Sequence, residues 1–330
     1  MYTPEPLLIE DTAPVVNSHP RIAGIGAALP ERVVSNAQIA ARAGVDEQWI
    51  LKRTGIRNRR HADPDLELLD LATTAAEKAL ADAERPARAT DLVIFATVSQ
   101  RQPMPNLAPQ LAARIGAAHA GAFDLGAACN GFISGLATAA AYIESGRARQ
   151  VLLLAADMLS RQTDPTDRTT AALFGDGAAA VLLAAGREGT PWTIELGSDG
   201  ACAGLIENDR STGLIRMQGH ETFIHAVARM EEATRGVCET AGTPLHEVDL
   251  FVFHQANARI TSALTERLQI PADSVVDAIA ELGNTSAASV PLALEQARAE
   301  GRLGDASRVL LCAVGAGFTW GAALIDGYGR

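Results

Sequence analysis

Short apolar runs alternate with Ala- and Leu-rich stretches from residue 21 onward. The apolar runs are rich in aliphatic or β-branched side chains, which is typical of buried strands. They lie at 22–25, 92–97, 151–155 and 178–183. The stretch 66–83 instead repeats its aliphatic residues at helical spacing and predicts an amphipathic helix. The alternation of the two patterns predicts an α/β fold.

The second half of the chain, from about residue 193, repeats this order. Helices are predicted at 223–241, 260–268 and 287–299, and strands at 250–253, 309–313 and 322–325. Several residues recur 158 positions later, so that Asp91 and Leu92 match Asp249 and Leu250. The Ser-Gly-Arg turn at 145 matches the Glu-Gly-Arg turn at 300, which is 155 positions later. We interpret the pattern as an internal duplication with a three-residue loop difference.

The duplication also predicts where two polar side chains meet. At the offset of 155, Cys129 falls opposite Asn284, and each would stand at the start of the equivalent helix. Both are therefore expected to face one cleft between an N-terminal half, 21–192, and a C-terminal half, 193–330. Residues 1–20 are predicted to form a loose acidic tail.

Composition indicates a large folded core. The 330 residues (34.5 kDa) are 48% hydrophobic and 20% charged, which argues against intrinsic disorder. No apolar run approaches the roughly 20 residues of a membrane helix. The net charge of -11 and the pI near 5.1 argue against nucleic acid or an anionic membrane as a partner. One basic cluster, Arg53, Arg57, Arg59 and Arg60, predicts a patch suited to a phosphate-bearing ligand.

The cysteines and the N-terminus bear on location. The start MYTPEPLLIEDTAPVV has no basic segment followed by an apolar run, so neither a secretory signal nor a transit peptide is expected. The four cysteines, at 129, 202, 238 and 312, lack CxxC spacing and a nearby His pair. This argues against a zinc site or a disulfide framework and favours a reducing cytoplasm.

Three residues are candidates for chemistry. Cys129 stands where a predicted strand gives way to the helix 131–145, and a helix start favours a thiolate. His254 ends the apolar strand 250–253, at the edge where open α/β sheets present ligand-binding groups. Asn284 precedes a helix rich in small residues. Taken singly, each has an ordinary structural interpretation: a buried hydrophobic thiol, a hydrogen-bonded strand-end His and a helix cap.

Their motifs are more specific in combination. The chain contains WILKRTGIR (49–57), DPTDR (164–168), FGDGA (174–178), HQAN (254–257), GNTSAAS (283–289) and GFTWG (317–321). Together these segments, spread over 21–325, resemble β-ketoacyl-acyl-carrier-protein synthase III, a condensing enzyme of the thiolase superfamily. The resemblance implies a duplicated five-layered α/β/α/β/α fold, a homodimer and a Cys-His-Asn site.

The resemblance also implies a reaction. An acyl-CoA, a substrate and not a cofactor, would acylate Cys129, with the backbone N–H groups of Cys129 and Ala316 as the oxyanion hole. A malonyl-acyl carrier protein would then lose CO2 with His254 and Asn284 as hydrogen-bond donors, which needs no metal or redox cofactor. Elongating condensing enzymes and thiolases carry a second His where this chain has Asn284, so priming is the expected chemistry.

Further site residues follow from the same resemblance. The residues expected to bind CoA are Trp49, Arg53, Arg168, Met217, Gly219 and Asn257. The acyl pocket is expected to contain Leu159, Phe174, Val314 and Met104, the last inserted from the partner subunit, and carrier docking is assigned to Arg259 and Arg267.

The chain departs from familiar members at several of these positions. Val314 and Met104 replace Phe, and Ala316 replaces Gly. The smaller Val314 and the flexible Met104 favour an acyl group larger than acetyl. Ile224 and Glu266 stand where Lys is usual, which admits an unusual carrier.

Three functions remain open at this point. The first is a decarboxylating condensing enzyme that starts fatty-acid or polyketide chains. The second is a relative that passes the acyl group to another O, N or C nucleophile. A non-catalytic partner subunit is disfavoured because Cys129, His254 and Asn284 are all present.

Overall fold

Two sheets carry the strands of the two sequence halves. The computed structural model describes residues 18–186, 191–304 and 307–329. The first sheet has the order β1 (His19–Ala28), β7 (Asp176–Gly186), β6 (Gln150–Met158), β4 (Leu92–Ala96), β5 (Gly121–Leu125). The second has the order β8 (Thr193–Ser198), β13 (Thr319–Asp326), β12 (Arg308–Gly315), β11 (Leu250–Phe253). The two sheets share one topology. A parallel pair (β4 with β6, or β11 with β12) is followed by two antiparallel pairs, and the first sheet has the additional strand β5, parallel to β4.

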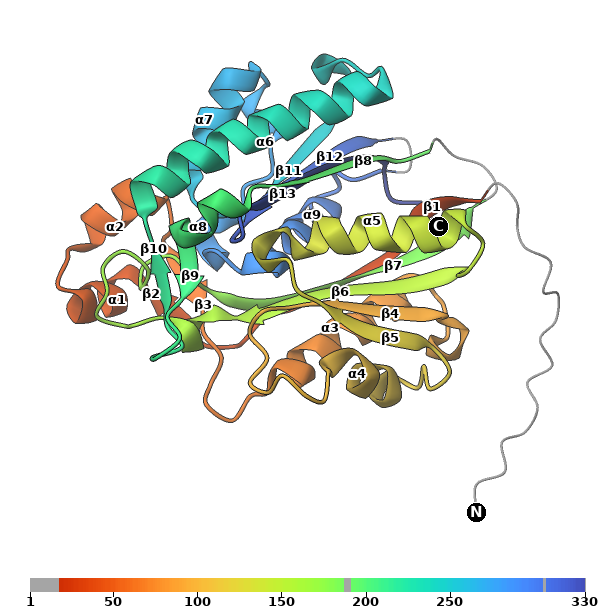
Figure 1. Cartoon of the computed structure of the whole chain (residues 1–330), viewed down its shortest axis with the longest axis horizontal. Coiled ribbons are helices and arrows are strands. Elements are labelled where there is room, and N and C mark those ends of the chain that lie inside the picture. The colour runs from red at the N-terminus through yellow and green to blue at the C-terminus, as the bar shows by residue number, and fades with distance from the viewer. Residues whose placement is uncertain (1–17, 187–190, 305–306, 330) are drawn as a thin grey trace.

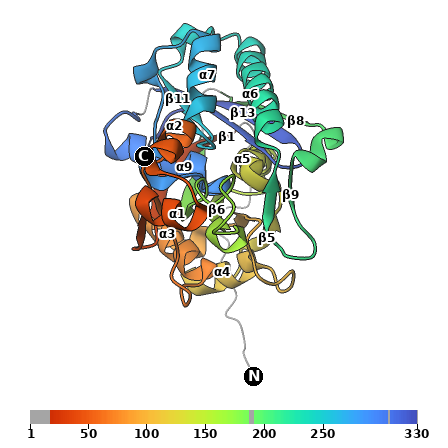
Figure 2. The same cartoon turned by 90° about the vertical axis from the view of Figure 1, so that its left-hand side faces the viewer.

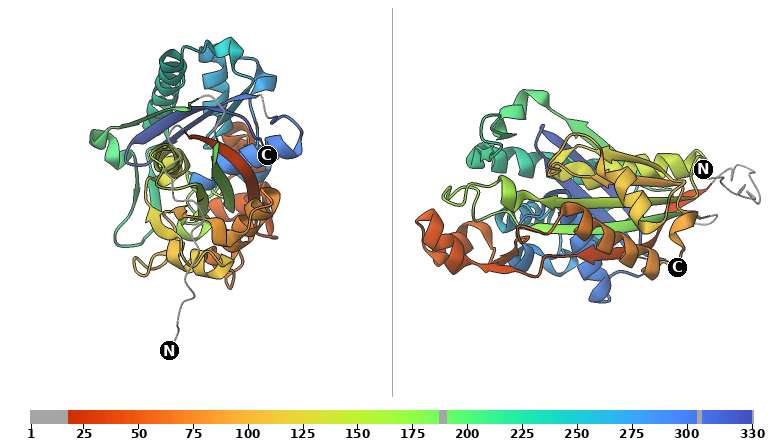
Figure 3. Two further views of the ribbon diagram at one scale, coloured as in Figure 1. Left: turned by 90° about the vertical axis from the view of Figure 1, so that its right-hand side faces the viewer. Right: turned by 90° about the horizontal axis from the view of Figure 1, so that it is seen from below.

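Helices cover and separate these sheets in five layers (Figure 1). The inner layer holds α5 (Gly131–Glu144) and α9 (Ser289–Ala299), and the outer layers hold α3 (Leu68–Asp82) with α4 (Leu107–Ile115), and α6 (Gly219–Ala241) with α7 (Ala258–Leu268). The two end-on views, Figure 2 and the left panel of Figure 3, show the same layers of helices and sheets. The predicted duplicated α/β/α/β/α fold is thereby confirmed.

Smaller elements lie toward one end of the layers (Figure 1). They are α1 (Asn36–Ala43), α2 (Glu47–Thr54), α8 (Ile279–Leu282), the pair β2 (Val33–Ser35) and β3 (Asn58–Arg60), and the pair β9 (Ile206–Asn208) and β10 (Ile215–Met217). No helix in the described part of the chain is long and apolar enough to cross a membrane.

The apolar runs form strands because both faces of each sheet are covered. Along β6, Val151 and Leu153 pack into the inner core, whereas Leu152 and Leu154 pack against α3 and α4. Alternate side chains of a strand point to opposite faces, so an unbroken apolar run suits a strand that is buried on both sides. Strand β1 begins at His19, so residues 19 and 20 of the predicted tail belong to the sheet, and residues 1–17 lie outside the described residues.

The matched aspartates make the same hydrogen bond in both halves. Asp91 accepts a hydrogen bond from the backbone N–H of Gln150 at 2.9 Å, and Asp249 accepts one from that of Arg308 at 2.8 Å. Both pairs differ by the offset of 158 and join the start of one strand to that of its parallel neighbour. The repeated sequence pattern therefore reflects a repeated structural role.

The prediction that Cys129 and Asn284 occupy equivalent positions in the two repeats is wrong. The 3-10 turns η2 (Ala128–Asn130) and η7 (Ser286–Ala288) correspond at offset 158, and their first residues have φ values of 47° and 54°. The counterpart of Cys129 is therefore Ala287. Helix α5 has 14 residues and α9 has 11, so the three-residue difference lies in helix length and not in a loop before Asn284.

Candidate active site

A cavity of about 470 Å3 contains the candidate residues of both halves. Cys129 from the first half and His254, Asn284 and Ala316 from the second all line it. A volume of this size suits a small-molecule ligand. The sequence therefore identified side chains that the fold brings to one cavity, although the roles assigned to them stay predictions.

Cys129 lies in the turn η2 between β5 and α5, with its sulfur 3.6 Å from the Ser286 hydroxyl oxygen. Burial raises the pKa of its thiol to about 12, and the negative charge of Asp157 adds to the increase while the Ser286 hydrogen bond opposes it. Loss of hydration is the largest cause of this increase and favours the neutral thiol at rest. The thiolate expected at a helix start stays a prediction for the reacting state.

Gly315, the last residue of β12, lets this strand approach the Cys129 turn closely. A Cβ at position 315 would lie 2.8 Å from the backbone nitrogens of Cys129 and Asn130, closer than real Cβ contacts. The methyl group would displace the backbone N–H of Cys129 that is predicted to bind the oxyanion. Backbone atoms cannot move aside as a flexible side chain does, so the geometry of this turn depends on glycine.

Gly315→Ala is expected to slow acyl loading by about 10²-fold, the usual effect of losing one oxyanion donor. Rapid-quench mass spectrometry of the acyl-enzyme would measure the rate. Gly200→Ala is the matched control, because its Cβ would meet no atom within 4 Å. Equal loading rates in the two variants would contradict the expectation.

His254 follows β11 and is 2% exposed. Its backbone N–H donates to the Cys312 carbonyl at 2.7 Å, and its ring Nδ1 lies 2.5 Å from the hydroxyl oxygen of Ser289. Because Ser289 occupies Nδ1, Nε2 is the ring nitrogen left for a ligand. Burial lowers the pKa of His254 to about 3, since the imidazolium would lose its hydration.

This burial predicts a pH dependence of stability. The folded protein keeps His254 neutral, whereas the unfolded chain protonates it below about pH 6.5. Its contribution is therefore lost as the pH falls from about 6.5 toward 3, at about 1.4 kcal/mol per pH unit. Urea unfolding at pH 7.5 and 5.5 should show the wild type losing about 1.4 kcal/mol more than His254→Gln. The same loss in both proteins would argue against a neutral buried imidazole.

Asn284 is fixed by its backbone and its side-chain oxygen. Its N–H donates to the Leu173 carbonyl at 2.8 Å, and its carbonyl accepts from Gly175 at 2.9 Å. The side-chain Oδ1 accepts from the Ser286 N–H at 2.9 Å. An amide whose oxygen is engaged in this way presents its NH2 group to the cavity.

Sequence reasoning missed Gln255 as a residue that positions the site. The buried Gln255 Oε1 accepts from the N–H groups of Ala278 and Ile279 at 3.0 Å each, and Nε2 donates to the Phe253 carbonyl at 2.7 Å. These bonds tie the His254 strand to the segment that leads through α8 to Asn284. The signal was the Gln of the HQAN motif, directly after His254.

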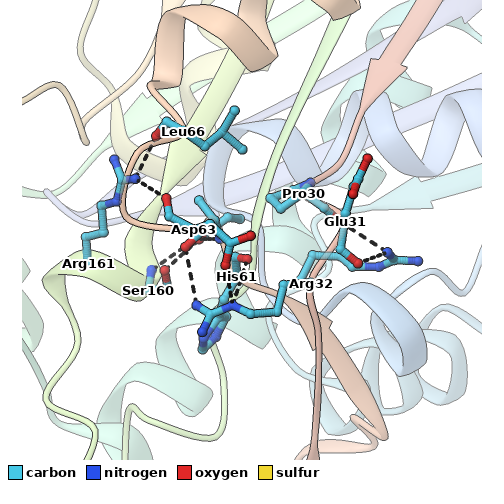
Figure 4. Close-up of polar contacts among 11 residues, drawn as sticks. Pro30, Glu31, Arg32, His61, Asp63, Leu66, Ser160 and Arg161 are labelled. Carbon is cyan, nitrogen blue, oxygen red and sulfur yellow. Dashed lines mark hydrogen bonds and ion pairs between the residues drawn. The ribbon is translucent and has the colours of Figure 1, made fainter.

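Other predicted residues also lie in the cavity wall. They are Leu159, Phe174 and Val314 of the acyl pocket, Met217, Gly219 and Asn257 of the CoA path, and Arg259. Leu159 begins the 3-10 turn η3 (Leu159–Gln162), where Arg161 donates to the carbonyls of Asp63 at 2.9 Å and Leu66 at 2.6 Å (Figure 4). These contacts anchor η3 to the segment before α3.

Five predicted residues are not among those that line the cavity: Trp49, Arg53, Arg168, Met104 and Arg267. The Arg53 guanidinium lies 5.5 Å from the Trp49 ring centroid, and the Arg53 carbonyl accepts from Asn257 at 3.2 Å. This bond connects α2 to the cavity wall. Met104 is 79% exposed. The guanidinium of Arg267 pairs with Glu231 at 3.2 Å.

The predicted basic patch is not present as a single patch. Arg59 is fully buried, and its guanidinium donates to Asn36 Oδ1 at 2.9 Å and to the Ala172 carbonyl at 2.8 Å. The Arg57 side chain instead pairs with Glu281 at 3.1 Å. Neighbouring positions on β3 point to opposite faces, so a run of arginines in sequence does not stay together in space.

Comparison with known proteins places the chain in a family. Residues 123–200 match the family model 3-Oxoacyl-[acyl-carrier-protein (ACP)] synthase III, and residues 238–326 match the model of its C-terminal part. The chain is 44% identical to beta-ketoacyl-[acyl-carrier-protein] synthase III 2 of Streptomyces coelicolor over 307 residues, 92% of each protein.

Solved structures agree. The crystal structure of 3-oxoacyl-[acyl-carrier-protein] synthase III from Aquifex aeolicus is similar with a TM-score of 0.91 and 40% identity, over 94% of this chain and 100% of that one. A priming β-ketosynthase from a polyketide biosynthetic pathway is similar with a TM-score of 0.89 and 35% identity, over 96% and 99% of the two chains. The chain belongs to the 3-oxoacyl-[acyl-carrier-protein] synthase III family of acyl-transferring condensing enzymes.

Proposed function

We propose that the chain starts fatty-acid or polyketide synthesis by moving an acyl group from acyl-CoA to Cys129 and condensing it with malonyl-acyl carrier protein. The observation that carries the proposal is one cavity lined by Cys129, His254, Asn284 and Ala316. A nucleophile, two hydrogen-bond donors and an oxyanion loop are the groups that this chemistry needs.

Loading begins with attack of the Cys129 sulfur on the thioester carbonyl. The backbone N–H groups of Cys129 and Ala316 stabilise the oxygen, which becomes negative only in the transition state. The CoA thiol leaves and the acyl group stays on Cys129. Two easier steps thus replace one difficult transfer.

The condensation step then uses His254 and Asn284 from the C-terminal half of the chain. The malonyl thioester loses CO2, and its oxygen gains negative charge as the enolate forms. Nε2–H of a neutral His254 and the NH2 group of Asn284 donate to this oxygen, each worth roughly 3 to 4 kcal/mol in a water-poor site. The enolate carbon attacks the acyl carbonyl and expels Cys129 as product forms. We propose no metal or redox cofactor, because the substrates supply the leaving thiol and the CO2.

The CoA chain is proposed to pass Met217, Gly219 and Asn257, which line the cavity. Its nucleotide end would then reach Trp49, Arg53 and the exposed Arg168. Val314 leaves more room beside the acyl group than an aromatic side chain does, which favours starters larger than acetyl. The proposal keeps the cytoplasmic location expected from the sequence, since Cys129 must stay reduced to act.

Carrier docking is proposed on α7 beside the cavity. Arg259 is exposed there, lines the cavity and lies 5.3 Å from the Phe223 ring centroid. Arg267 adds a second positive charge on α7, although Glu231 pairs with it. Ile224 is 51% exposed, so an apolar contact replaces a charged one at this position.

A homodimer is also proposed. Strand β5 is at an edge of its sheet, and four of its five residues are half-buried. Two such edges pair readily with each other. Met104 is strongly exposed in the segment before α4, and a side chain that inserts into the partner subunit has to be exposed in the single chain. Light scattering should give about twice the monomer mass.

Carbon dioxide release tests the proposed reaction. Malonyl-acyl carrier protein labelled in its free carboxylate and a panel of acyl-CoA donors are mixed with the enzyme, and labelled CO2 and acyl-Cys129 are both measured. Acylation followed by CO2 release is expected. Acylation without CO2 would favour transfer to another nucleophile, and absence of acylation would overturn the proposal.

A further inference from the structure

A buried carboxyl group lies next to the proposed acyl pocket. Asp176, the first residue of β7, is fully buried. Its Oδ1 accepts a hydrogen bond from the Ser160 N–H at 2.9 Å. Its Oδ2 accepts one from the Ser160 hydroxyl at 2.5 Å and one from the Ala62 N–H at 2.7 Å. Since two of the three donors belong to Ser160, the carboxyl group fixes both the position and the orientation of that residue.

This contact lies where two walls of the cavity leave the first sheet. Strands β6 and β7 are antiparallel, and their pairing ends with Met158 opposite Asp176. Leu159 directly follows Met158, and Phe174 lies two residues before Asp176. Both side chains line the cavity that contains Cys129. Because the strand pairing ends there, the Asp176 side chain continues the connection between the two segments.

The two walls belong to one buried apolar cluster. Leu159 and Phe174 are part of this cluster together with Ile215, and all three line the cavity. The Phe174 carbonyl oxygen lies 3.3 Å from His61 Nε2. The residue after His61 donates to Asp176, so one short segment contacts the Phe174 wall and the buried carboxyl group at once. Polar contacts therefore fix the Leu159 wall relative to the Phe174 wall.

An apolar pocket rejects a longer acyl chain only when its walls do not yield. In a rigid pocket one methylene changes selectivity by about 10- to 200-fold. Leu159 stands on the 3-10 turn η3, which has four residues. Such turns have poor internal hydrogen-bond geometry, so the position of η3 depends on contacts from outside the turn.

We infer that the link between Asp176 and Ser160 sets the size limit of the acyl pocket, because it fixes Leu159 relative to Phe174. Neither Asp176 nor Ser160 is among the residues that line the cavity, so both are positioning residues and do not touch the acyl group. The inference rests on the proposed function, which supplies that acyl group. The enzyme is expected to load donors up to a definite length and to discriminate against longer ones.

Competition among acyl-CoA donors tests the inference. The enzyme is mixed with equimolar saturated donors from acetyl to hexadecanoyl, and intact-protein mass spectrometry at early times gives their relative loading rates. In Ser160→Ala, a donor two carbons longer than the best wild-type donor should gain about threefold to tenfold relative to that best donor, because Leu159 can yield. Asp176→Asn should show at least the same gain, because its amide nitrogen cannot accept a hydrogen bond.

Ser18→Ala is the matched control. It removes another buried serine hydroxyl, which donates to the Ile143 carbonyl at 3.2 Å and is not among the groups that line the cavity. Its donor profile should equal that of the wild type. Should Asp176→Asn fail to fold, Ser160→Ala carries the same test.

Ratios measured within one protein do not depend on how much of that protein is active. A partly unfolded variant therefore cannot imitate the expected gain. A loss of loading that is equal for all donors, a shift toward shorter donors, or a wild type that loads all lengths equally would overturn the inference. A wild type that loads no donor would refute the proposed function, whereas wild-type loading with unchanged ratios in both variants would refute the inference alone.

Discussion

Cys129→Ala is expected to abolish covalent loading and to lower the rate of condensation by a factor on the order of 10⁴ or more. The variant removes the Cys129 sulfur, which is the only protein atom that forms a bond to the acyl group in the proposed chemistry. Its cavity and the donors His254 and Asn284 are unchanged. Intact-protein mass spectrometry after exposure to acyl-CoA should show no added acyl mass, and condensation product should fall with it.

Cys202→Ala is the matched control for this prediction. Cys202 is also a half-buried free cysteine, but it is not among the residues that line the cavity. Its variant should load and condense like the wild type. Acyl mass found on the Cys129→Ala protein at the active site would mean that another group is the nucleophile, and the proposed function would have to be abandoned.

Asn284→Ala should separate the two half-reactions. Loading should stay within about threefold of wild type, whereas decarboxylation should slow by about 10²- to 10³-fold, because the side-chain N–H acts on the enolate oxygen alone. Labelled CO2 release measures the second step, and acyl-enzyme mass measures the first. An equal loss in both steps would show that the residue shapes the whole cavity and does not act as a donor.

Asn284→Asp refines that test. The carboxylate keeps an oxygen that accepts from the Ser286 N–H, so the local turn is preserved. It lacks the NH2 donor and places negative charge beside a developing negative charge. Decarboxylation should therefore be at least as slow as in Asn284→Ala. A faster rate in Asn284→Asp would indicate that the loss in Asn284→Ala came from a disturbed turn.

The regular elements could be predicted because their burial is periodic. The strand predicted at 250–253 matches β11, and the helix predicted at 66–83 contains α3. Repeats separated by 158 residues predicted the matched sheets, since residues such as Asp91 and Asp249 serve the same hydrogen bond. The counterpart of Cys129 could not be predicted, because only the length of α9 locates the three-residue difference.

The active site was likewise predictable only in part: its reactive side chains could be identified from the sequence, but their burial could not. Motifs identified the side chains that carry chemistry, because those residue types are specific in combination. Burial is a tertiary property, so the sequence did not reveal that Arg59 is inside the protein or that desolvation would raise the pKa of Cys129. The buried Asp157 beside the Cys129 turn was missed for the same reason, because its partners Thr97 and Ala287 are distant in sequence.

The contact between η2 and η7 has a mechanical consequence. The nucleophile and the donors come from different halves of the chain. The polar links across the boundary near the site include the Cys129–Ser286 contact at 3.6 Å, the hydrogen bond from the Ala287 N–H to Asp157 at 3.4 Å, and the two backbone bonds of Asn284 to Leu173 and Gly175. A slip of one sheet by about 1 Å would leave both sheets folded yet cost roughly 10²-fold in rate. The turnover rate is therefore more sensitive to the alignment of the duplicated halves than the free energy of unfolding is. Changes in the packing of α5 or α9 can alter this rate although neither change contacts a ligand.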